Sequence, residues 1–411
     1  MLRDMTVPNG SDLVIVVGAG PVGMAAALAL RAHGLDVLIV EAEPAERVRP
    51  GSRAIFVHRE SLQLLDAFQP GLGHRIADAG LVWPTRRSTF RGRDVYKHTY
   101  PPLPPGVLPP STSLPQVETE AILLHACQAA GIRFRWSAPV TDVKVTGHEV
   151  VVTLESGEQL RSPYVVGADG ARSAVRPALG ISLDGPRSEI PFVIVDVAEL
   201  PDHPMPLERV FNYQYPGVDG RNVLLVPFAG GWRIDLQCRQ DDDAEEFSSE
   251  QGVRRWLARV LDPRYADRVR WVSTYRFLQA VAREFSDPER RVLLVGEAAH
   301  LFAPFGARGM NSGIADAAAA ATAIRAALDS DSPAAARQAV EHFAADRRDA
   351  ALYNRDAART ALAHMQGRGV WANLKRRVAT TLAPRVERAG LWLDTAPYGP
   401  RAGRRGKPGR Y

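Results

Sequence analysis

The chain opens with apolar and small-residue segments whose lengths suit strands and helices. Residues 13–17 (LVIVV) and 37–40 (VLIV) are short apolar runs of the kind found in buried strands. Between them, residues 22–33 place apolar and small side chains at helical spacing, and Gly34 ends that segment. The order strand, helix, strand predicts a βαβ unit, which is typical of a parallel sheet covered by helices.

Two later segments also run from an apolar strand into a turn and a helix. Residues 164–167 (YVVG) precede Asp169 and Gly170, a pair that suits a tight turn. Residues 292–295 (VLLV) lead through a glycine-rich loop to an alanine-rich stretch at 310–328. Both segments therefore predict strand–turn–helix units.

The middle of the chain has a different pattern. Strands are predicted at 192–197, 209–215, 222–227 and 232–238, with glycines in the turns between them. Short strands joined by such turns predict a mostly antiparallel sheet. The acidic run at 241–246 is expected to be a solvated loop.

Length and composition are those of an ordinary globular protein. A chain of 411 residues, 45% hydrophobic and 24% charged, is long enough for two domains. No apolar run approaches a membrane-spanning length, and the N-terminus lacks the apolar core of a signal peptide. Cys127 and Cys238 cannot build a disulfide framework and have no metal-ligand spacing, so a cytoplasmic location and no metal site are expected.

Positive charge is concentrated at the C-terminus. The net charge is +5, but residues 370–411 hold ten Lys and Arg against Glu387 and Asp394, which gives +8 there and −3 elsewhere. A basic, Gly-rich end could bind nucleic acid or an anionic membrane surface. Short charge runs are more often solubilising and disordered, so no nucleic-acid partner is expected, and the end is expected to be disordered.

A glycine motif follows the first predicted strand directly. Gly18, Gly20 and Gly23 form G-x-G-x-x-G, and Glu41 ends the second predicted strand. Gly18 permits the tight turn, Gly20 lets a pyrophosphate approach the helix start, and Gly23 permits close helix–strand packing. The Glu41 carboxylate can accept hydrogen bonds from a ribose. The unit predicts a dinucleotide site without distinguishing FAD from NAD.

The glycine-rich loop before the alanine-rich helix has its own chemistry. Its helix start at Gly309, Met310 and Asn311 leaves backbone N–H groups unpaired, and the helix dipole makes that end positive. A plain helix cap does not need the four glycines that this loop region contains. We therefore expect an electron-rich part of a ligand to lie there.

In this order and spacing, the three segments resemble the flavoprotein aromatic hydroxylases of the para-hydroxybenzoate hydroxylase type. The resemblance covers about residues 12–365 and implies FAD as the cofactor. It implies an α/β fold with a Rossmann-like FAD-binding domain, an inserted, mostly antiparallel β-sheet substrate domain and C-terminal helices. The implied FAD contacts are Gly18, Ala19, Gly20, Pro21, Val22, Gly23, Glu41, Arg53, Gln116, Asp169, Gly170, Glu297, Pro304, Gly309, Met310 and Asn311.

One residue departs from the family pattern. The family usually has aspartate where this chain has Glu297, which stands one methylene further from the backbone. His300 beside it is expected to serve packing and not catalysis. The expected division of the chain is an FAD-binding domain at 1–74, 99–179 and 272–365, a substrate domain at 75–98 and 180–271, and a basic C-terminal extension at 366–411.

The resemblance also implies a reaction. NAD(P)H would bind transiently and reduce the flavin, and O2 would then give a flavin C4a-hydroperoxide that hydroxylates an aromatic or polyketide-like small molecule. Baeyer–Villiger oxygenation, an oxidase and a dehydrogenase remain alternatives within the same family. A monomer or homodimer is expected, and no catalytic side chain is assigned.

The substrate is the least specified part. In para-hydroxybenzoate hydroxylase, a serine and an arginine on one strand hold the substrate carboxylate, whereas the comparable strand here, 222–228, carries no charge. This favours a larger apolar ring over a benzoate. Asn212, Tyr213, Leu225 and Arg233 are candidate substrate contacts, although an ordinary half-exposed sheet explains such residues more simply.

Other protein classes fit the sequence less well. A nicotinamide dehydrogenase would need Glu41 but not the segments around Asp169 and Glu297. A flavin-dependent halogenase would carry a Trp-x-Trp-x-Ile-Pro stretch, which is absent. A reductase with two dinucleotide domains would need a second G-x-G-x-x-G. A non-enzymatic docking protein has only the basic tail in its support.

Overall fold

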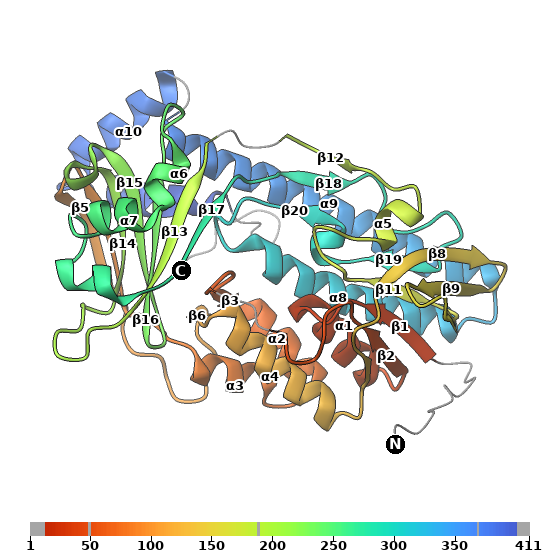
Figure 1. Ribbon diagram of the computed structural model, residues 1–411. Helices are drawn as coiled ribbons and strands as arrows, with labels where there is room; N and C mark the ends of the chain where they lie inside the picture. Colours follow the sequence, from red (N-terminus) through yellow and green to blue (C-terminus); the bar gives the residue numbers. More distant parts are fainter. Residues whose placement is uncertain (1–12, 48–50, 187–189, 368–369, 401–411) are drawn as a thin grey trace.

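Two β-sheets organise the computed structural model, in which residues 13–47, 51–186, 190–367 and 370–400 are described (Figure 1). The N-terminal residues 1–12 and the basic tail at 401–411 lie outside the described residues. The predictions of an N-terminus without a signal peptide and of a disordered end both fall on those segments. Within the described part, no helix is both long and apolar enough to cross a membrane.

The first sheet has five parallel strands in the order β19–β11–β1–β2–β7. Four of these strands were predicted from the sequence, and each lies within one residue of its predicted bounds. The strands are β1 Leu13–Val17, β2 Asp36–Val40, β7 Arg133–Arg135, β11 Val165–Gly167 and β19 Val292–Leu294.

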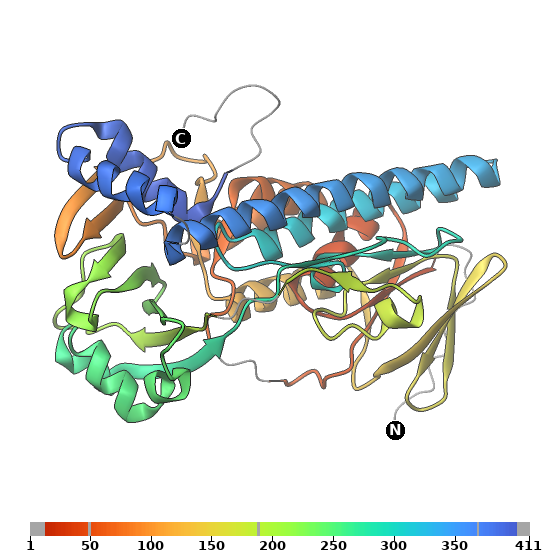
Figure 2. The same cartoon turned by 90° about the horizontal axis from the view of Figure 1, so that it is seen from above.

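Helices with small side chains pack closely on this sheet. Helix α1 (Pro21–Ala32) connects β1 to β2 and packs against α8 (Arg308–Leu328). A Cβ atom at Gly313 would overlap the side chain of Val22, so glycine permits this close approach. The long helix α9 (Pro333–Gln366) runs beside α8 (Figure 2).

The carboxyl ends of the parallel strands meet at one edge of the sheet. β1 leads into Gly18, β2 into Glu41, β11 into Asp169 and β19 into Glu297. Ligands of open parallel sheets bind at this edge, where connections leave the sheet in opposite directions. Parallel pairing thus brings together three motifs that lie far apart in the sequence.

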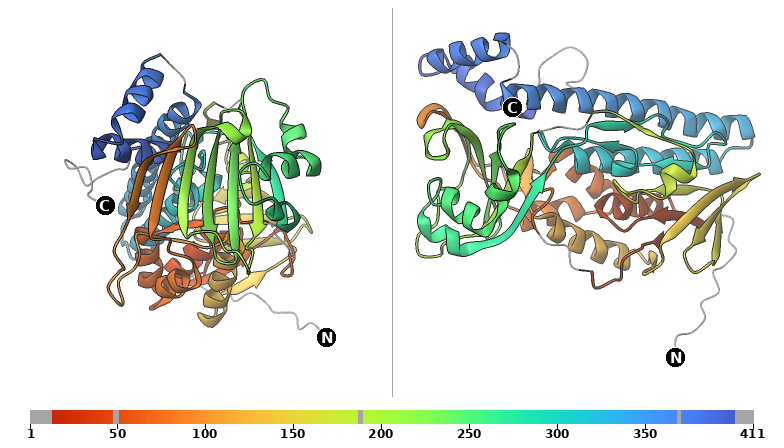
Figure 3. Two further views of the ribbon diagram at one scale, coloured as in Figure 1. Left: turned by 90° about the vertical axis from the view of Figure 1, so that its left-hand side faces the viewer. Right: turned by 45° about the horizontal axis from the view of Figure 1, so that its top comes forward.

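The second sheet has seven strands in the order β17–β13–β16–β15–β14–β4–β5 (Figure 3). All neighbouring pairs are antiparallel except β14 with β4, so the prediction of a mostly antiparallel sheet is confirmed. The strands are β4 Thr85–Phe90, β5 Arg93–Thr99, β13 Phe192–Ala198, β14 Glu208–Tyr215, β15 Arg221–Phe228, β16 Gly231–Gln237 and β17 Val269–Tyr275.

Both faces of this sheet are covered. Its outer face packs under α6 (Ala244–Ser248), α7 (Glu250–Leu257) and the 3-10 helix η2 (Pro263–Arg268). The inner face, which carries Phe192 and Phe211, packs against the loop at 302–305 and against α9. The expectation of a solvated acidic loop at 241–246 is wrong in part, because α6 begins there and Asp242 forms a buried ion pair with Arg221 (2.5 Å).

The C-terminal helices close one end of the inner face. They are α10 (Val370–Leu382), α11 (Glu387–Thr395) and the 3-10 helix η4 (Ala396–Tyr398), and α11 packs on β4 and β5. Asp394 is fully buried there and pairs with Arg209 of β14. This segment, expected to be a basic extension, is therefore part of the folded body as far as residue 400.

The remaining elements are short or connect these layers. They are β3 Phe56–His58, α2 Arg59–Phe68, α3 Leu72–Ala79, β6 Ser111–Ser113, α4 Gln116–Ala129, β8 Val140–Thr146, β9 Glu149–Leu154, β10 Gln159–Ser162, α5 Val175–Ala178, β12 Leu183–Asp184, η1 Pro216–Val218, β18 Ala280–Ala282, η3 Gly296–Ala298 and β20 His300–Leu301.

Candidate functional site

The turn between β1 and α1 uses its three glycines in different ways. Gly18 has φ +105°, and a Cβ there would lie 2.5 Å from the carbonyl oxygen of Ala168. A Cβ at Gly23 would overlap the carbonyl oxygen of Gly18. Among the residues that the structure describes, and apart from its neighbours in the chain and helix, no atom lies within 4 Å of a Cβ at Gly20. Gly18 and Gly23 are thus required by packing, whereas the space beside Gly20 remains for a ligand at the start of α1, as a pyrophosphate site requires.

The buried carboxylate of Glu41 also orders this turn. One oxygen accepts a hydrogen bond from the Ala19 N–H (2.6 Å), and the other accepts one from the Glu43 N–H (3.0 Å). The Arg47 guanidinium lies 3.5 Å from Glu41 and donates to the Ala19 carbonyl (2.6 Å). Each carboxylate oxygen can accept more than one bond, so Glu41 retains capacity for a ribose hydroxyl. No spacing in the sequence indicated Arg47.

Asp169 has one satisfied and one unsatisfied oxygen. Its Oδ2 accepts from the N–H groups of Ala174 (2.7 Å) and Val175 (3.0 Å) and so caps α5. Its Oδ1 is buried and has no hydrogen-bond partner in the structure. An unpaired buried acceptor next to Gly18 fits a hydroxyl donor of the expected dinucleotide, because burying it unpaired would be costly.

Glu297 stands at the carboxyl end of β19 with its side chain open to solvent, yet the protein around it is dense. Desolvation therefore raises the pKa of Glu297, and electrostatic interaction with His300 and Arg53 opposes that rise. His300 itself is fully buried, and its Nε2 lies 2.7 Å from Asp316. Burial would raise the pKa of Asp316, but His300 and Arg347 hold it below its usual range. His300 thus belongs to a buried hydrogen-bond network, and its expected packing role stays a prediction.

The start of α8 presents backbone and not side chains. Ala307, in a left-handed conformation (φ 51°), precedes the helix, which begins at Arg308. A Cβ at Gly309 would meet no atom of the described residues within 4 Å apart from its own helix and neighbours, so this turn leaves room for a group close to its backbone. The Asn311 side chain is committed elsewhere: it accepts from His58 N–H (2.9 Å) and Ser61 Oγ–H (2.7 Å). Pro304 is exposed and Met310 is buried in the same loop region.

Arg53 and Gln116 lie together beside this edge. The Gln116 side chain accepts from the Ala54 N–H (3.3 Å), and its backbone N–H donates to the Ser52 carbonyl (2.9 Å). Arg53 is exposed and has φ +50°. The structure thus brings Arg53, Gln116 and Glu297 to the same region as the two dinucleotide segments.

The four substrate candidates separate onto the two faces of the seven-stranded sheet. Arg233 and Tyr213 lie on the inner face, where Arg233 donates to the Arg53 carbonyl and Tyr213 donates to the Leu393 carbonyl (2.6 Å). Leu225 packs in the core under α7, and Asn212, in register with outer-face Val223, accepts from Thr89 Oγ1 (2.8 Å). Only the first two therefore share a face with the loop at 302–305.

Aromatic side chains that sequence reasoning did not select lie where that loop meets the inner face. The ring of Phe305 lies 5.4 Å from Phe192 and 5.7 Å from Phe277, measured between ring centroids. Arg308, also missed, is buried and donates to the carbonyls of Tyr398 (3.1 Å) and Pro400 (2.5 Å). The sequence around Phe305 and Arg308 does not reveal these contacts, because the residues that they touch lie far away in the sequence.

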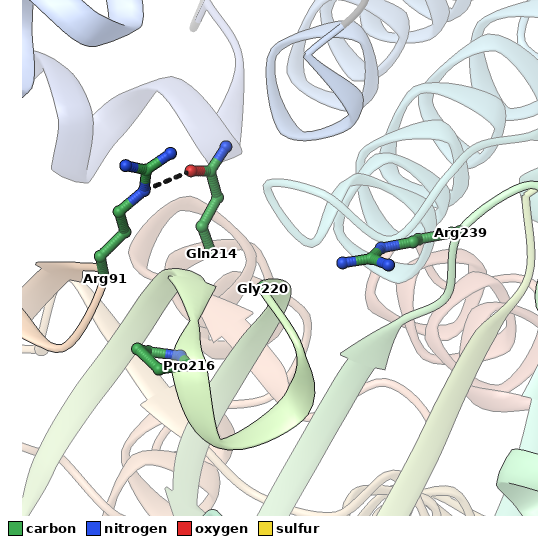
Figure 4. Close-up of a pocket in the computed structure, with 5 residues that line it drawn as sticks. All are labelled: Arg91, Gln214, Pro216, Gly220 and Arg239. Atoms are coloured by element: carbon green, nitrogen blue, oxygen red, sulfur yellow. Dashed lines mark hydrogen bonds between the residues drawn. The ribbon is translucent and has the colours of Figure 1, made fainter.

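A surface hollow of about 580 Å³ lies elsewhere, at the turns that end β4 and β14 (Figure 4). It is lined by Arg91, Gln214, Pro216, Gly220 and Arg239. None of the predicted FAD residues lines it, so the motif geometry and not this hollow defines the candidate site. In the described ranges, no three His, Cys, Asp or Glu side chains gather as a metal site.

Comparison with known proteins agrees with this geometry. A family model described as an FAD binding domain matches residues 12–355. A rifampicin monooxygenase from Streptomyces venezuelae is 32% identical over 74% of this chain and 62% of its own length. A para-nitrophenol 4-monooxygenase from a Pseudomonas species is 29% identical over 82% of this chain and 83% of its own length.

Solved structures show the same fold. The crystal structure of p-nitrophenol 4-monooxygenase from Pseudomonas putida matches with a TM-score of 0.76 and 25% identity, over 95% of this chain and 98% of that one. Several curated relatives are longer, and the chain spans 62% and 54% of the first two. With its FAD-binding sheet, its inner-facing second sheet and a family match over most of its length, the chain belongs to the FAD-binding flavoprotein monooxygenase family that its three motifs resembled.

Proposed function

We propose that this protein is an FAD-dependent monooxygenase that uses NAD(P)H and O2 to hydroxylate an aromatic or polyketide-like ring. One observation carries the proposal: Phe305, in the loop expected to border the flavin, packs on Phe192 of the inner face and on Phe277, which follows the end of β17. A ring held beside that loop would meet aromatic side chains, which favour stacked or edge-on contacts with another ring.

The residues divide the binding of FAD among them. The pyrophosphate of FAD would lie in the space beside Gly20 at the start of α1. Hydroxyl groups of FAD would donate to the unpaired Oδ1 of Asp169 and to the Glu297 carboxylate. The flavin ring would lie against the open backbone at Gly309. When bound, FAD supplies the chemistry that links NAD(P)H oxidation to oxygen transfer. The N–H groups at the start of α8 stabilise negative charge on a group placed there, and the apolar loop excludes water.

The inner face favours a substrate without a carboxylate. Arg233, a charged candidate on that face, is already bonded to Asp235 (2.7 Å) and to the Arg53 carbonyl. The strand β15 beside it contributes Leu224 to the inner face. Among the relatives, names such as 6-methylpretetramide 4-monooxygenase and rifampicin monooxygenase point to large ring systems. We propose that this chain acts on an uncharged or phenolic ring of that kind.

The test begins with FAD itself. Protein supplied with FAD is reduced anaerobically by NADH or NADPH in a stopped-flow instrument, with and without para-nitrophenol, rifampicin or a tetracycline as probe. We expect at least one ring compound to accelerate reduction, and one atom of oxygen-18 gas to enter the product. A product formed without label, while NAD(P)H is consumed, would refute oxygen transfer.

A second candidate function has specific support. A relative from Streptomyces rugosporus named dialkyldecalin synthase is 28% identical over 75% of this chain. That name describes formation of a carbon ring system, so an FAD site in this family need not transfer oxygen. If this chain resembles that relative in function, a product would form from a suitable polyene without consuming NAD(P)H or oxygen.

A further inference from the structure

The loop at 51–54, which carries Arg53, adopts a conformation that its own sequence does not favour. Arg53 has φ +50°, a left-handed conformation that is unfavourable for a non-glycine residue. Gly51 also has positive φ (+81°), which glycine tolerates. Such a strained residue persists only where its surroundings hold it.

The surroundings are a row of three side chains across the seven-stranded sheet. Asp196 of β13 is in register with Arg233 of β16 on one side and with Trp271 of β17 on the other. Paired residues of neighbouring strands point to the same face, so these three side chains form one row on the inner face. Figure 1 shows the three strands side by side.

Each successive residue of the loop meets one member of this row. A Cβ at Gly51 would overlap the indole of Trp271, so the backbone lies directly on that ring. Ser52 donates its N–H (2.6 Å) and its hydroxyl (2.8 Å) to the two oxygens of Asp196. Arg233 donates to the carbonyl oxygen of Arg53. Ser52 and Asp196 are 2% and 3% exposed, which removes competing water from these bonds.

The other side of the loop faces predicted FAD contacts. Gln116 bonds to both neighbours of Arg53: its side chain accepts from the Ala54 N–H and its backbone N–H donates to the Ser52 carbonyl. The Arg53 side chain is exposed, and its charge lies near enough to Glu297 to oppose the rise in the pKa of that residue. Arg53 thus lies between these two residues of the proposed FAD site, while its carbonyl is held by the seven-stranded sheet.

We propose that the row Trp271–Asp196–Arg233 is a positioning device that fixes Arg53 for contact with bound FAD, so that the second sheet controls part of the cofactor site. This rests on the proposed FAD site. Asp196 is a positioning residue here and not a catalytic one, because it reaches the cofactor only through the loop. In this proposal Arg233 holds the loop that carries Arg53 and does not bind the substrate.

The test is a double-mutant cycle on FAD affinity. The apoprotein of the wild type, Asp196→Asn, Arg53→Ala and the double variant is titrated with FAD and followed by flavin fluorescence. We expect each single variant to raise the Kd about tenfold, which is about 1.4 kcal/mol. If Asp196 acts through Arg53, the double variant binds FAD as weakly as Arg53→Ala alone, because the second change removes nothing further.

A second readout follows the loop without any cofactor. Hydrogen exchange of the Ser52 and Ala54 amides in the apoprotein is expected to accelerate in Asp196→Asn. The milder Ser52→Ala, which removes one of the two bonds, should give an intermediate Kd. The control is Glu199→Gln, which alters a carboxylate of the same domain bonded to Trp232 Nε1 (2.7 Å) and to the Tyr265 hydroxyl. It should leave the Kd and the loop exchange unchanged.

The outcomes separate this inference from the proposed function. A wild type that does not bind FAD overturns the proposed function itself. A wild type that binds FAD while Asp196→Asn binds it equally well overturns the positioning role. Additive effects in the double variant also overturn it, since they mean that Asp196 stabilises the protein without acting through Arg53.

Discussion

Replacing Gly20 by alanine tests whether this glycine is needed for FAD binding and not for the stability of the fold. Gly20 has φ −72° and ψ 177°, an extended conformation that alanine adopts without strain. In the described part of the chain, no atom outside the local backbone lies within 4 Å of the added Cβ. We therefore expect the free energy of unfolding of the apoprotein to stay the same or to rise by about 0.4–1 kcal/mol, because alanine restricts the unfolded chain.

FAD affinity should respond in the opposite direction. If the pyrophosphate lies against the backbone at Gly20, a methyl group there moves it away from the N–H donors of the first turn of α1. Losing one charge-assisted hydrogen bond costs about 1.5–3 kcal/mol, which raises the Kd by about one to two decades. The measurement is titration of apoprotein with FAD, alongside thermal unfolding of the same apoprotein.

Gly23→Ala is the matched comparison. Its Cβ would overlap the Gly18 carbonyl oxygen, so the turn must open and both thermal stability and FAD affinity should fall. An apoprotein of Gly20→Ala that is stable and binds FAD with unchanged Kd would show that no phosphate lies at this turn. The assignment of the dinucleotide to the start of α1 would then be wrong.

Three further changes test other parts of the structure. Glu297→Ala should raise the Kd for FAD about ten- to hundredfold without lowering the melting temperature of the apoprotein, since the side chain is exposed before FAD binds; an unchanged Kd would remove it from the site. Burial lowers the pKa of His364 to about 4, so this side chain takes up a proton in the unfolded chain at a higher pH than in the folded protein. The free energy of unfolding, measured by urea titration, should therefore fall by about 2 kcal/mol between pH 7.5 and pH 5, and His364→Asn should abolish that fall. Asp394→Asn leaves the buried Arg209 without its counter-charge and should cost about 3–5 kcal/mol in the same titrations, whereas a loss below 1 kcal/mol would mean that water reaches this pair.

The local parts of the fold and site could be predicted because local chemistry determines them. A run such as 13–17 is buried whatever surrounds it, and the turn after it requires glycine at Gly18 and Gly23 on steric grounds alone. The start of α8 was predicted two residues late, since Ala307 takes up the left-handed turn that the sequence did not reveal. For β13, β14, β15 and β16 of the second sheet the predicted bounds were also close, because the turns between them contain glycine, whereas β4, β5 and β17 were not predicted.

The orientation of that second sheet could not be predicted. Alternation identifies the solvent face of a strand only where one face meets water, and here both faces are covered. Strand β13 is buried at every position, and β16 at all but Asp235. For this reason the sequence offered Leu225 and Arg233 equally as substrate contacts, although they lie on opposite faces. The C-terminal contact at Asp394 was missed because its partner lies 185 residues earlier.

Buried charged side chains connect segments whose relative placement the apolar pattern of the sequence does not predict. Asp196 joins the loop at 51–54 to the second sheet, Arg209 with Asp394 joins that sheet to the C-terminal helix, and Arg308 joins the proposed flavin loop to residues 398–400. Arg209–Asp394 is a buried ion pair, which adds little net stability because desolvation offsets its attraction, whereas Asp196 and Arg308 bond to uncharged groups. Each contact leaves a buried charge unpaired in any arrangement where the partners fail to meet. The apolar clusters therefore make the layers stable, and these three contacts penalise alternative placements of the loop at 51–54, the C-terminal helix and the proposed flavin loop.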